Sequence, residues 1–204
     1  MNASDSVEFF DTQFQQQVRD RDFRLNPFEL AALPYLHGHV LDYGCGLGNL
    51  AFAAAHCGCS VLALDASPAA ITHIRQRAAT EGLPVQAALA ERRDYELDED
   101  FDVVVSIGLL MFFDRPTAFK ALSNPQAHIR QGGIAVGNVP FDGTTYLYMF
   151  DADSYRLFRR TELESRFSGW RILYSEFSDF DAADGQRKAF ATITAPRPLA
   201  VPEP

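Results

Sequence analysis

The sequence predicts an α/β fold in which helices cover both faces of a mostly parallel, seven-stranded sheet. Strand-like and helix-like segments alternate from Val40 to Val139, which is typical of βαβ units. The last two strand-like runs follow each other around Asp184-Gly185 and predict an antiparallel hairpin at the sheet edge. The chain has 204 residues, of which 47% are hydrophobic, so it can build one well-buried core but not two full domains. The expected strands are the run that ends with Val40 and Leu41, then 60–64, 85–89, 101–106, 134–139, 170–177 and 187–195.

The best-marked helix begins after Ser67. This serine is a suitable N-cap, Pro68 fits the first helical position, and Gly82 marks the end. Apolar residues that share one side of this helix predict that it packs on the sheet.

Two further helices are less regular. We expect one over about 116–130, broken by the proline at 125. Thr161 and Glu164 form a capping-box pattern, which predicts a short helix that ends at Gly169.

The remaining segments complete a single domain over 1–195. Residues 1–38 form an N-terminal helical segment, and 141–160 is an aromatic-rich stretch without a clean period, which we interpret as a candidate lid insertion. The proline-rich tail, 196–204, is expected to be disordered.

The most informative segment is VLDYGCGLGN, residues 40–49. Gly44, Gly46 and Gly48 provide backbone that can adopt positive φ or lie directly against a ligand. An apolar helical run, 50–56, follows at once. A strand, a glycine turn and a helix start in this order bind the polar parts of a nucleoside through main-chain N–H groups.

The glycine spacing narrows the choice of nucleoside. Asn49 occupies the position of the third glycine in a dinucleotide motif, and no Lys-Ser or Lys-Thr pair follows as a P-loop requires. Asp65 ends the next strand, where a carboxylate can accept hydrogen bonds from both ribose hydroxyls. The pattern therefore favours adenosine on a group without phosphate.

These residues resemble the class I S-adenosylmethionine-dependent methyltransferases. Three later segments, DFDVVVSIGLLMFF at 100–113, the pair Gly132-Gly133 and the ending KAFATITA, resemble the tellurite-resistance methyltransferases of the TehB type. The resemblance runs from about Arg19 to Ala195. It implies a Rossmann-like, doubly wound sheet with an antiparallel C-terminal hairpin, S-adenosylmethionine as cofactor, and enzymatic methyl transfer.

The resemblance also implies the cofactor contacts. Asp42 would lie near the amino group of the methionine moiety, and Asp65 would bind the ribose. An arginine before the first strand would hold the methionine carboxylate; Arg24 matches best, with Arg19 and Arg21 as alternatives. The remaining implied contacts are the loop residues Gly44, Cys45 and Gly46, the adenine neighbours Ala66, Ala90 and Glu91, and Ser106, which would face the methyl group.

Composition limits the partners. The chain has 27 acidic and 18 basic residues, a formal charge of -9, which repels nucleic acid and anionic membranes. The N-terminal residues lack a secretory pattern, and no apolar run approaches the roughly 20 residues of a membrane span. Three cysteines fit a reducing cytoplasm, and their single C-x-C pair offers too few ligands for a metal. We expect a cytoplasmic monomer or homodimer that acts on a small molecule.

The acceptor of the methyl group is the least defined part. Thiols, small acids and chalcogen oxyanions stay open, no general base is identified, and the catalytic residues are unknown. The acidic stretch 179–184 disfavours tellurite by charge repulsion. Asn138 begins a partial match to the NPPF tetrad of amine methyltransferases, but it follows the wrong strand and is not assigned a role. A non-catalytic sensor of S-adenosylmethionine or S-adenosylhomocysteine is the alternative, and Asn49 disfavours a nicotinamide dehydrogenase.

Overall fold

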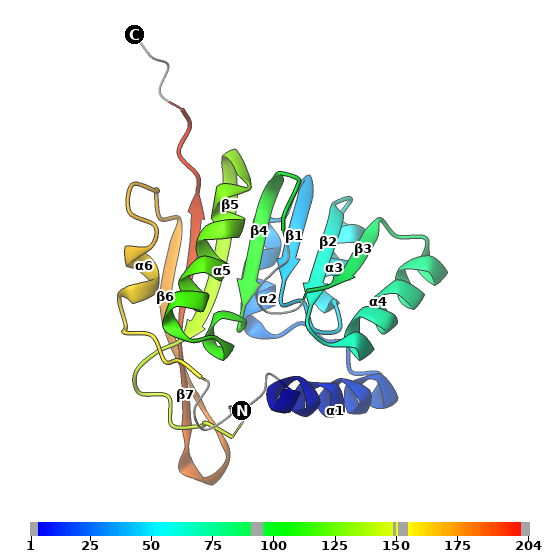
Figure 1. Ribbon diagram of the computed structural model, residues 1–204, viewed down its shortest axis with the longest axis horizontal. Coiled ribbons are helices and arrows are strands. Elements are labelled where there is room, and N and C mark those ends of the chain that lie inside the picture. The colour runs from blue at the N-terminus through cyan, green and yellow to red at the C-terminus, as the bar shows by residue number, and fades with distance from the viewer. Residues whose placement is uncertain (1–3, 91–95, 149, 151–154, 201–204) are drawn as a thin grey trace.

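Seven strands form one sheet in the order β3-β2-β1-β4-β5-β7-β6 (Figure 1). The computed structural model describes residues 4–90, 96–148, 150 and 155–200. β1 to β5 run parallel, whereas β7 is antiparallel to β5 and β6 is antiparallel to β7. The predicted sheet, with its antiparallel C-terminal hairpin, is confirmed. The strands are β1 (His39–Tyr43), β2 (Ser60–Asp65), β3 (Val85–Leu89), β4 (Phe101–Ile107), β5 (Ile129–Pro140), β6 (Tyr174–Asp181) and β7 (Arg187–Pro196).

Helices pack on both faces of the sheet, and each face has its own apolar core. α2 (Pro27–Ala32), α3 (Asn49–His56) and α4 (Pro68–Glu81) contribute to one core, and α5 (Arg115–Ala127) and α6 (Glu162–Ser165) to the other. No helix in the described ranges combines the length and apolar character needed to cross a membrane. α1 lies beyond the carboxyl ends of the parallel strands (Figure 1). Its range is Ser4–Asp20, and short 3-10 turns complete the chain: η1 (Leu33–Tyr35), η2 (Leu110–Phe112) and η3 (Ala183–Gly185).

The local signals for α4 are confirmed. The Ser67 side chain accepts a hydrogen bond from the N–H of Ala70 at 3.0 Å, and Pro68 is the first helical residue. Gly82 ends the helix with φ of 65°, a left-handed conformation that glycine adopts at low cost.

Two helix predictions were wrong in detail. Pro125 does not break α5; it lies in the last turn, and the helix ends two residues later, at Ala127. The capping box at Thr161 is absent, since its side chain makes no cap hydrogen bond. The carboxylate of Glu162 instead accepts from the N–H of Arg159 at 3.1 Å. α6 ends at Ser165 rather than at Gly169.

The last three strands also differ from their predicted bounds. β5 begins at Ile129, so Gly132-Gly133 lies at a register shift inside the strand rather than before it. β6 begins at Tyr174, four residues later than expected. The tail was expected to be disordered from residue 196, yet β7 includes Pro196, and the N–H of Arg197 donates to the carbonyl of Gly133 at 2.7 Å. Residues 201–204 lie outside the described ranges.

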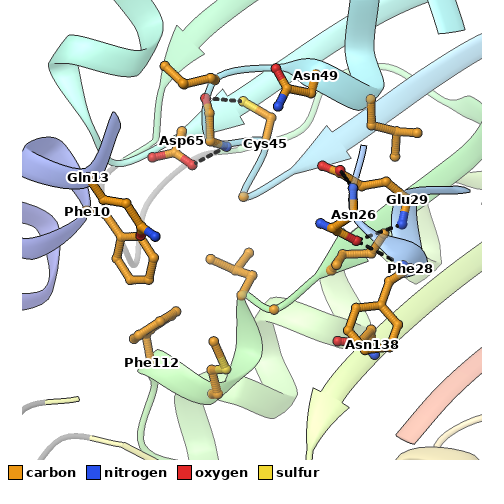
Figure 2. A pocket seen from close by; sticks show the side chains of 18 of the residues that line it. Phe10, Gln13, Asn26, Phe28, Glu29, Cys45, Asn49, Asp65, Phe112 and Asn138 are labelled. Atoms are coloured by element: carbon orange, nitrogen blue, oxygen red, sulfur yellow. Dashed lines mark hydrogen bonds between the residues drawn. The ribbon is translucent and has the colours of Figure 1, made fainter. Parts of the chain in front are cut away.

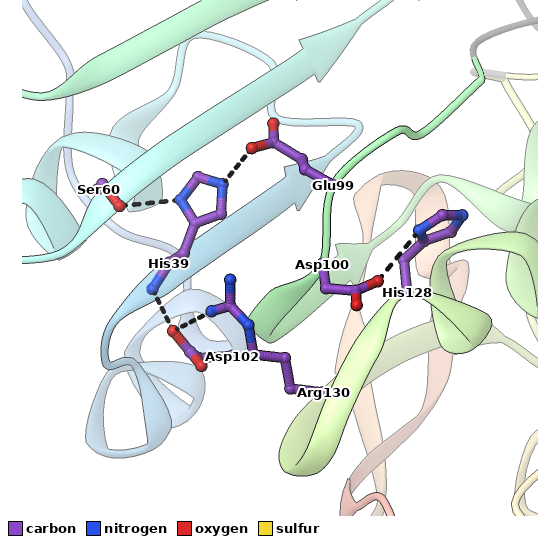
Figure 3. A network of polar contacts seen from close by, with 7 residues as sticks. All are labelled: His39, Ser60, Glu99, Asp100, Asp102, His128 and Arg130. Carbon is purple, nitrogen blue, oxygen red and sulfur yellow. Dashed lines mark hydrogen bonds and ion pairs between the residues drawn. The ribbon is translucent and has the colours of Figure 1, made fainter.

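The amino ends of the central strands share a polar network (Figure 3). The N–H of His39 donates to Asp102 Oδ2 at 2.7 Å, and Arg130 Nη1 lies 2.8 Å from the same oxygen. The His39 ring contacts Ser60 Oγ at 2.9 Å and Glu99 Oε2 at 3.0 Å. Burial opposes ionisation of Asp102, but the His39 N–H and the Arg130 guanidinium outweigh it and lower its pKa. The network ties β1, β2, β4 and β5 together at the end of the sheet opposite to the cleft described next.

Candidate functional site

A cleft of about 630 Å³ lies at the carboxyl ends of the parallel strands. Its walls come from α1, α2, the loop after β1, the end of β2, the segment after β4, and the ends of β5, β6 and β7. In open α/β sheets ligands bind at this edge, where the strand order reverses. β1 and β4 are the neighbours at which the order reverses here.

The glycine loop after β1 forms part of the floor. Gly44 has φ of 80°, and a Cβ there would lie 2.9 Å from Leu109 Cβ. Gly46 has φ of 52°, and a Cβ would lie 3.2 Å from Phe14 Cζ. Both positions therefore favour glycine for conformation, and Gly44 favours it for space as well, which keeps bare backbone facing the cleft.

Asp65, at the end of β2, is held by the loop that it faces. Its Oδ2 accepts from the N–H of Gly46 at 2.8 Å, and its Oδ1 accepts from the N–H of Ser67 at 2.9 Å (Figure 2). Burial raises the pKa of Asp65, and these N–H groups partly offset the increase. The carboxylate is thus fixed at the rim of the glycine loop, where the sequence placed the ribose contact.

Asp42 lies on the floor of the cleft and is 5% exposed. Its Oδ2 has no hydrogen-bond partner among the described residues. Burial, together with the negative charges of Glu29 and Asp65, raises the pKa of Asp42 to about 8. A buried carboxyl oxygen without a partner is stabilised by a cation or a strong hydrogen-bond donor, so Asp42 Oδ2 fits the ammonium group of an amino acid moiety.

Two polar neighbours of Asp42 were missed from the sequence. Asn49, the first residue of α3, lines the cleft, and its Oδ1 is likewise buried and unpartnered within the described chain. Glu29 lines the cleft from α2, and burial raises its pKa. Its Oε2 accepts from the N–H of Asn26 at 2.7 Å, which completes a capping box. The spacing N-x-x-E from Asn26 to Glu29 is a signal that could have located this helix start.

α1 forms one wall of the cleft, which no sequence motif indicated. Phe10 and Phe14 line the cleft, and the Phe10 ring packs edge-on against Phe112 with 5.3 Å between centroids. Asp11 of the same helix accepts a hydrogen bond from the Ser67 hydroxyl at the start of α4. Figure 2 shows Phe10 and Phe112 opposite the glycine loop.

The other sequence-predicted contacts fall into three groups. Cys45, Ala66 and Ala90 line the cleft, and burial raises the pKa of the Cys45 thiol well above its usual value. Arg24 also borders the cleft, but its guanidinium pairs with Asp22 at 2.7 Å and is exposed. Glu91 lies outside the described residues.

Ser106 was predicted to face the methyl group, but the structure places it away from the cleft. It is buried but does not line the cleft, and its Oγ is unpartnered in the part of the chain that the structure describes. Alternation along β4 turns it to the same side as Val104, toward the core under α5. Ile107, Gly108 and Leu109 line the cleft instead.

The end of the cleft under β5, β6 and β7 is aromatic. Phe28 of α2 packs against Phe180 and Phe190, with ring centroids 5.5 and 4.9 Å apart. Asn138 near the end of β5 also lines this part; its Nδ2 donates to Thr192 Oγ1 at 2.8 Å. In Figure 2, Asn138 and Phe28 are drawn on one side of the pocket and Asp65 on the other.

The sequence is similar to those of known methyltransferases. Residues 40–133 match the family described as Methyltransferase domain. The chain is 29% identical over 165 residues to Hemagglutinin 1 of Eikenella corrodens, covering 78% of this chain and 54% of that protein. It is 26% identical over 140 residues to the probable S-adenosyl-L-methionine-dependent methyltransferase TehB of Haemophilus influenzae. The match covers 67% of this chain and 48% of that protein.

A solved structure matches over a longer range. The crystal structure of TehB from Haemophilus influenzae superposes with a TM-score of 0.76 at 20% identity, covering 89% of this chain and 65% of that one. At this identity the match establishes the fold. The chain spans about half the length of the curated relatives named above.

Proposed function

We propose that this chain transfers a methyl group to a small-molecule acceptor. The premise is that it belongs to the class I S-adenosylmethionine-dependent methyltransferases and is close to the TehB type. The observation that carries the proposal is Asp42. Its unpartnered, buried carboxyl oxygen lies on the cleft floor beside a glycine loop, with a second fixed carboxylate at Asp65. This arrangement matches a ligand that has an ammonium group at one end and a ribose at the other.

Within this proposal each group has a role. Asp42 receives the methionine ammonium, and the unpartnered Oδ1 of Asn49 is a further acceptor on the same wall. Asp65 accepts hydrogen bonds from the ribose hydroxyls, and the small side chains of Ala66 and Ala90 leave room for adenine. Arg24 binds the methionine carboxylate by exchanging its partner Asp22.

When bound, S-adenosylmethionine supplies an electrophilic methyl group on a sulfonium, which reacts by in-line displacement. The residues of the chain align the two reactants and exclude water. Leu109, Met111 and Phe112 form an apolar wall of the cleft, and Phe10 of α1 packs against Phe112. Alignment of this kind can contribute several kcal/mol to catalysis.

The candidate lid, 141–160, also borders the cleft. Tyr146 lines it, and the ring of Phe150 packs against Phe112 with centroids 5.4 Å apart. Thr144 anchors the segment, because its hydroxyl donates to the carbonyl of Ala189 at 2.9 Å. We assign this segment to closure of the acceptor side.

Thiols, small acids and chalcogen oxyanions are the acceptors that the sequence left open. Apart from Asp42 and Asp65, which are assigned to the cofactor, the carboxyl groups of Glu29 and Asp181 line the cleft and disfavour acceptors that carry a negative charge. Among these candidates, an uncharged acceptor is therefore favoured over a carboxylate or an oxyanion.

Calorimetry with S-adenosylmethionine, S-adenosylhomocysteine and NAD tests the proposal. We expect binding of the first two and none of NAD; tight binding of NAD alone would overturn it. An acceptor panel scored for S-adenosylhomocysteine then separates an enzyme from a sensor. Binding without turnover of any acceptor would support the sensor instead.

A further inference from the structure

Asn138 carries a buried hydrogen-bond acceptor that nothing else in the described structure uses. The residue is 0% exposed and lines the cleft near the end of β5. Its Nδ2 is satisfied by Thr192 Oγ1 at 2.8 Å, whereas its Oδ1 has no partner among the described residues. The hydrogen bond to Thr192 fixes the amide, because Asn138 and Thr192 are paired residues of β5 and β7. An unpaired buried oxygen costs stability, so its natural complement is a ligand that donates a hydrogen bond.

Aromatic side chains line the same cleft as Asn138. Phe28, Phe180 and Phe190 form a cluster in which ring centroids lie 4.9 to 6.3 Å apart. Tyr146 adds a fourth ring that lines the cleft. Such a wall favours a flat, apolar skeleton, which can stack or pack edge-on against these rings.

The charges at this end disfavour an anionic ligand. Glu29 and Asp181 line the cleft as carboxyl groups. Of the two cationic side chains in its described lining, Arg24 is paired with Asp22, and Lys188 Nζ lies 4.2 Å from the centroid of the Tyr146 ring. A neutral ligand, or one that becomes positive during the reaction, is therefore better matched than an anion.

We propose that the methyl acceptor is an uncharged amine on an aromatic skeleton, which donates one N–H to Asn138 Oδ1. This inference rests on the methyltransferase function proposed above and names the acceptor for that same site. The hydrogen bond turns the nitrogen lone pair away from Asn138, and the aromatic wall holds the skeleton. Asn138 is then the residue that selects the acceptor.

The chemistry of an amine needs no base in the transfer step. The nitrogen lone pair forms the new N–C bond while the C–S bond breaks and its electron pair passes to sulfur. The positive charge moves from sulfur to nitrogen, and the methylated ammonium loses its proton to water afterwards. A neutral hydroxyl or thiol is a poorer nucleophile and must lose its proton to a base first. No histidine is present among the described residues that line the cleft.

A panel with one constant ring tests the acceptor class. Aniline, N-methylaniline, N,N-dimethylaniline, phenol, thiophenol and benzoate are each incubated with the protein and S-adenosylmethionine, and S-adenosylhomocysteine is quantified. We expect turnover of the first two amines at least 10-fold above that of the other compounds. N,N-dimethylaniline keeps the lone pair but has no N–H, so it reports on the hydrogen bond alone. Phenol, thiophenol or benzoate as the better substrate, or no turnover of either amine, would overturn the inference.

Variants at Asn138 test the residue. Asn138→Leu should lower kcat/KM for aniline by about 10- to 100-fold and weaken aniline binding to the S-adenosylhomocysteine complex, measured by calorimetry. Asn138→Asp keeps an acceptor oxygen of the same shape and should retain most of the aniline binding. Asn124→Leu makes the same chemical change at an exposed position of α5 and serves as the control.

The outcomes distinguish a failure of the proposed amine acceptor from a failure of the proposed methyltransferase function. If the unmodified protein does not bind S-adenosylhomocysteine, the methyltransferase proposal itself is refuted. Normal S-adenosylhomocysteine binding, together with equal aniline affinity in Asn138→Leu and the unmodified protein, would refute only the role of Asn138. Normal S-adenosylhomocysteine binding by Asn138→Leu itself shows that the variant is folded, so weaker aniline binding is not the result of a folding defect.

Discussion

Replacing Asp42 with asparagine should stabilise the protein and weaken its cofactor site at the same time. Burial, together with repulsion from Glu29 and Asp65, raises the pKa of Asp42 from 3.8 to about 8. The folded protein therefore holds this proton more tightly than the unfolded chain does. The contribution of Asp42 to stability is complete below about pH 4 and is lost as the pH rises toward 8.

The size of the effect follows from the two pKa values. Between 3.8 and pH 7, at about 1.4 kcal/mol per pH unit, the upper limit is about 4 kcal/mol. Entry of water and local relaxation reduce this penalty, so we expect Asp42→Asn to raise the free energy of unfolding by about 1 to 3 kcal/mol at pH 7. The gain should shrink toward pH 4 and level off above pH 8.

Urea unfolding of both proteins at a series of pH values from 4 to 9 measures this difference. Calorimetry with S-adenosylhomocysteine on the same samples should show that Asp42→Asn weakens binding by about 1.5 to 3 kcal/mol, the scale of a lost hydrogen bond to a charged group. In the unmodified protein, binding near pH 7 should release a proton, which appears as a heat that depends on the buffer. A stability difference that does not vary with pH would refute the reasoning about burial. Unchanged affinity would refute the ammonium contact.

Three further changes test other parts of the structure. Asp65→Ala should weaken S-adenosylhomocysteine binding by about 1 to 3 kcal/mol in calorimetry, whereas the exposed control Asp98→Ala should not; equal affinities would place the ribose elsewhere. Asp102→Asn should cost about 1 kcal/mol of unfolding free energy at pH 7. Because the folded pKa of Asp102 is lowered, that cost should disappear as the pH falls below about 4, and a constant cost in acid would contradict the ion pair. Gly44→Ala should destabilise the protein by about 1 to 3 kcal/mol more than Gly58→Ala, since both have positive φ but only Gly44 faces a clash; chemical denaturation that shows equal losses would argue against the close contact with Leu109.

The cofactor half of the site was largely readable from the sequence. The positions of Asp42, Gly44, Gly46 and Asp65 follow from spacing within two short segments, each a strand followed by a turn. Strand periodicity, glycine conformation and capping act over a few residues, so they leave a local pattern. The same reason explains why β1 to β4 and α4 were predicted close to their observed bounds.

The part of the cleft around Asn138, proposed for the acceptor, could not be predicted from the sequence because it forms only in the tertiary structure. Asn138 and Thr192 are 54 residues apart and meet only because β7 inserts antiparallel beside β5. Phe28 reaches the same place from the N-terminal segment, and Phe10 arrives with α1. Ser106 is a predicted contact that the tertiary structure excludes. Side chains alternate along β4, so Ser106 points to the core while its neighbour Ile107 lines the cleft.

VLDYGCGLGN alone thus predicted the place that we propose for the adenosine-bearing methyl donor, because its information is local to the chain. Strand order and helix packing decided what surrounds the donor. They brought Glu29 next to Asp42 and left the oxygen of Asn138 unpaired among aromatic rings. Contacts of this kind join distant segments, and their energy depends on burial that exists only once the sheet has formed.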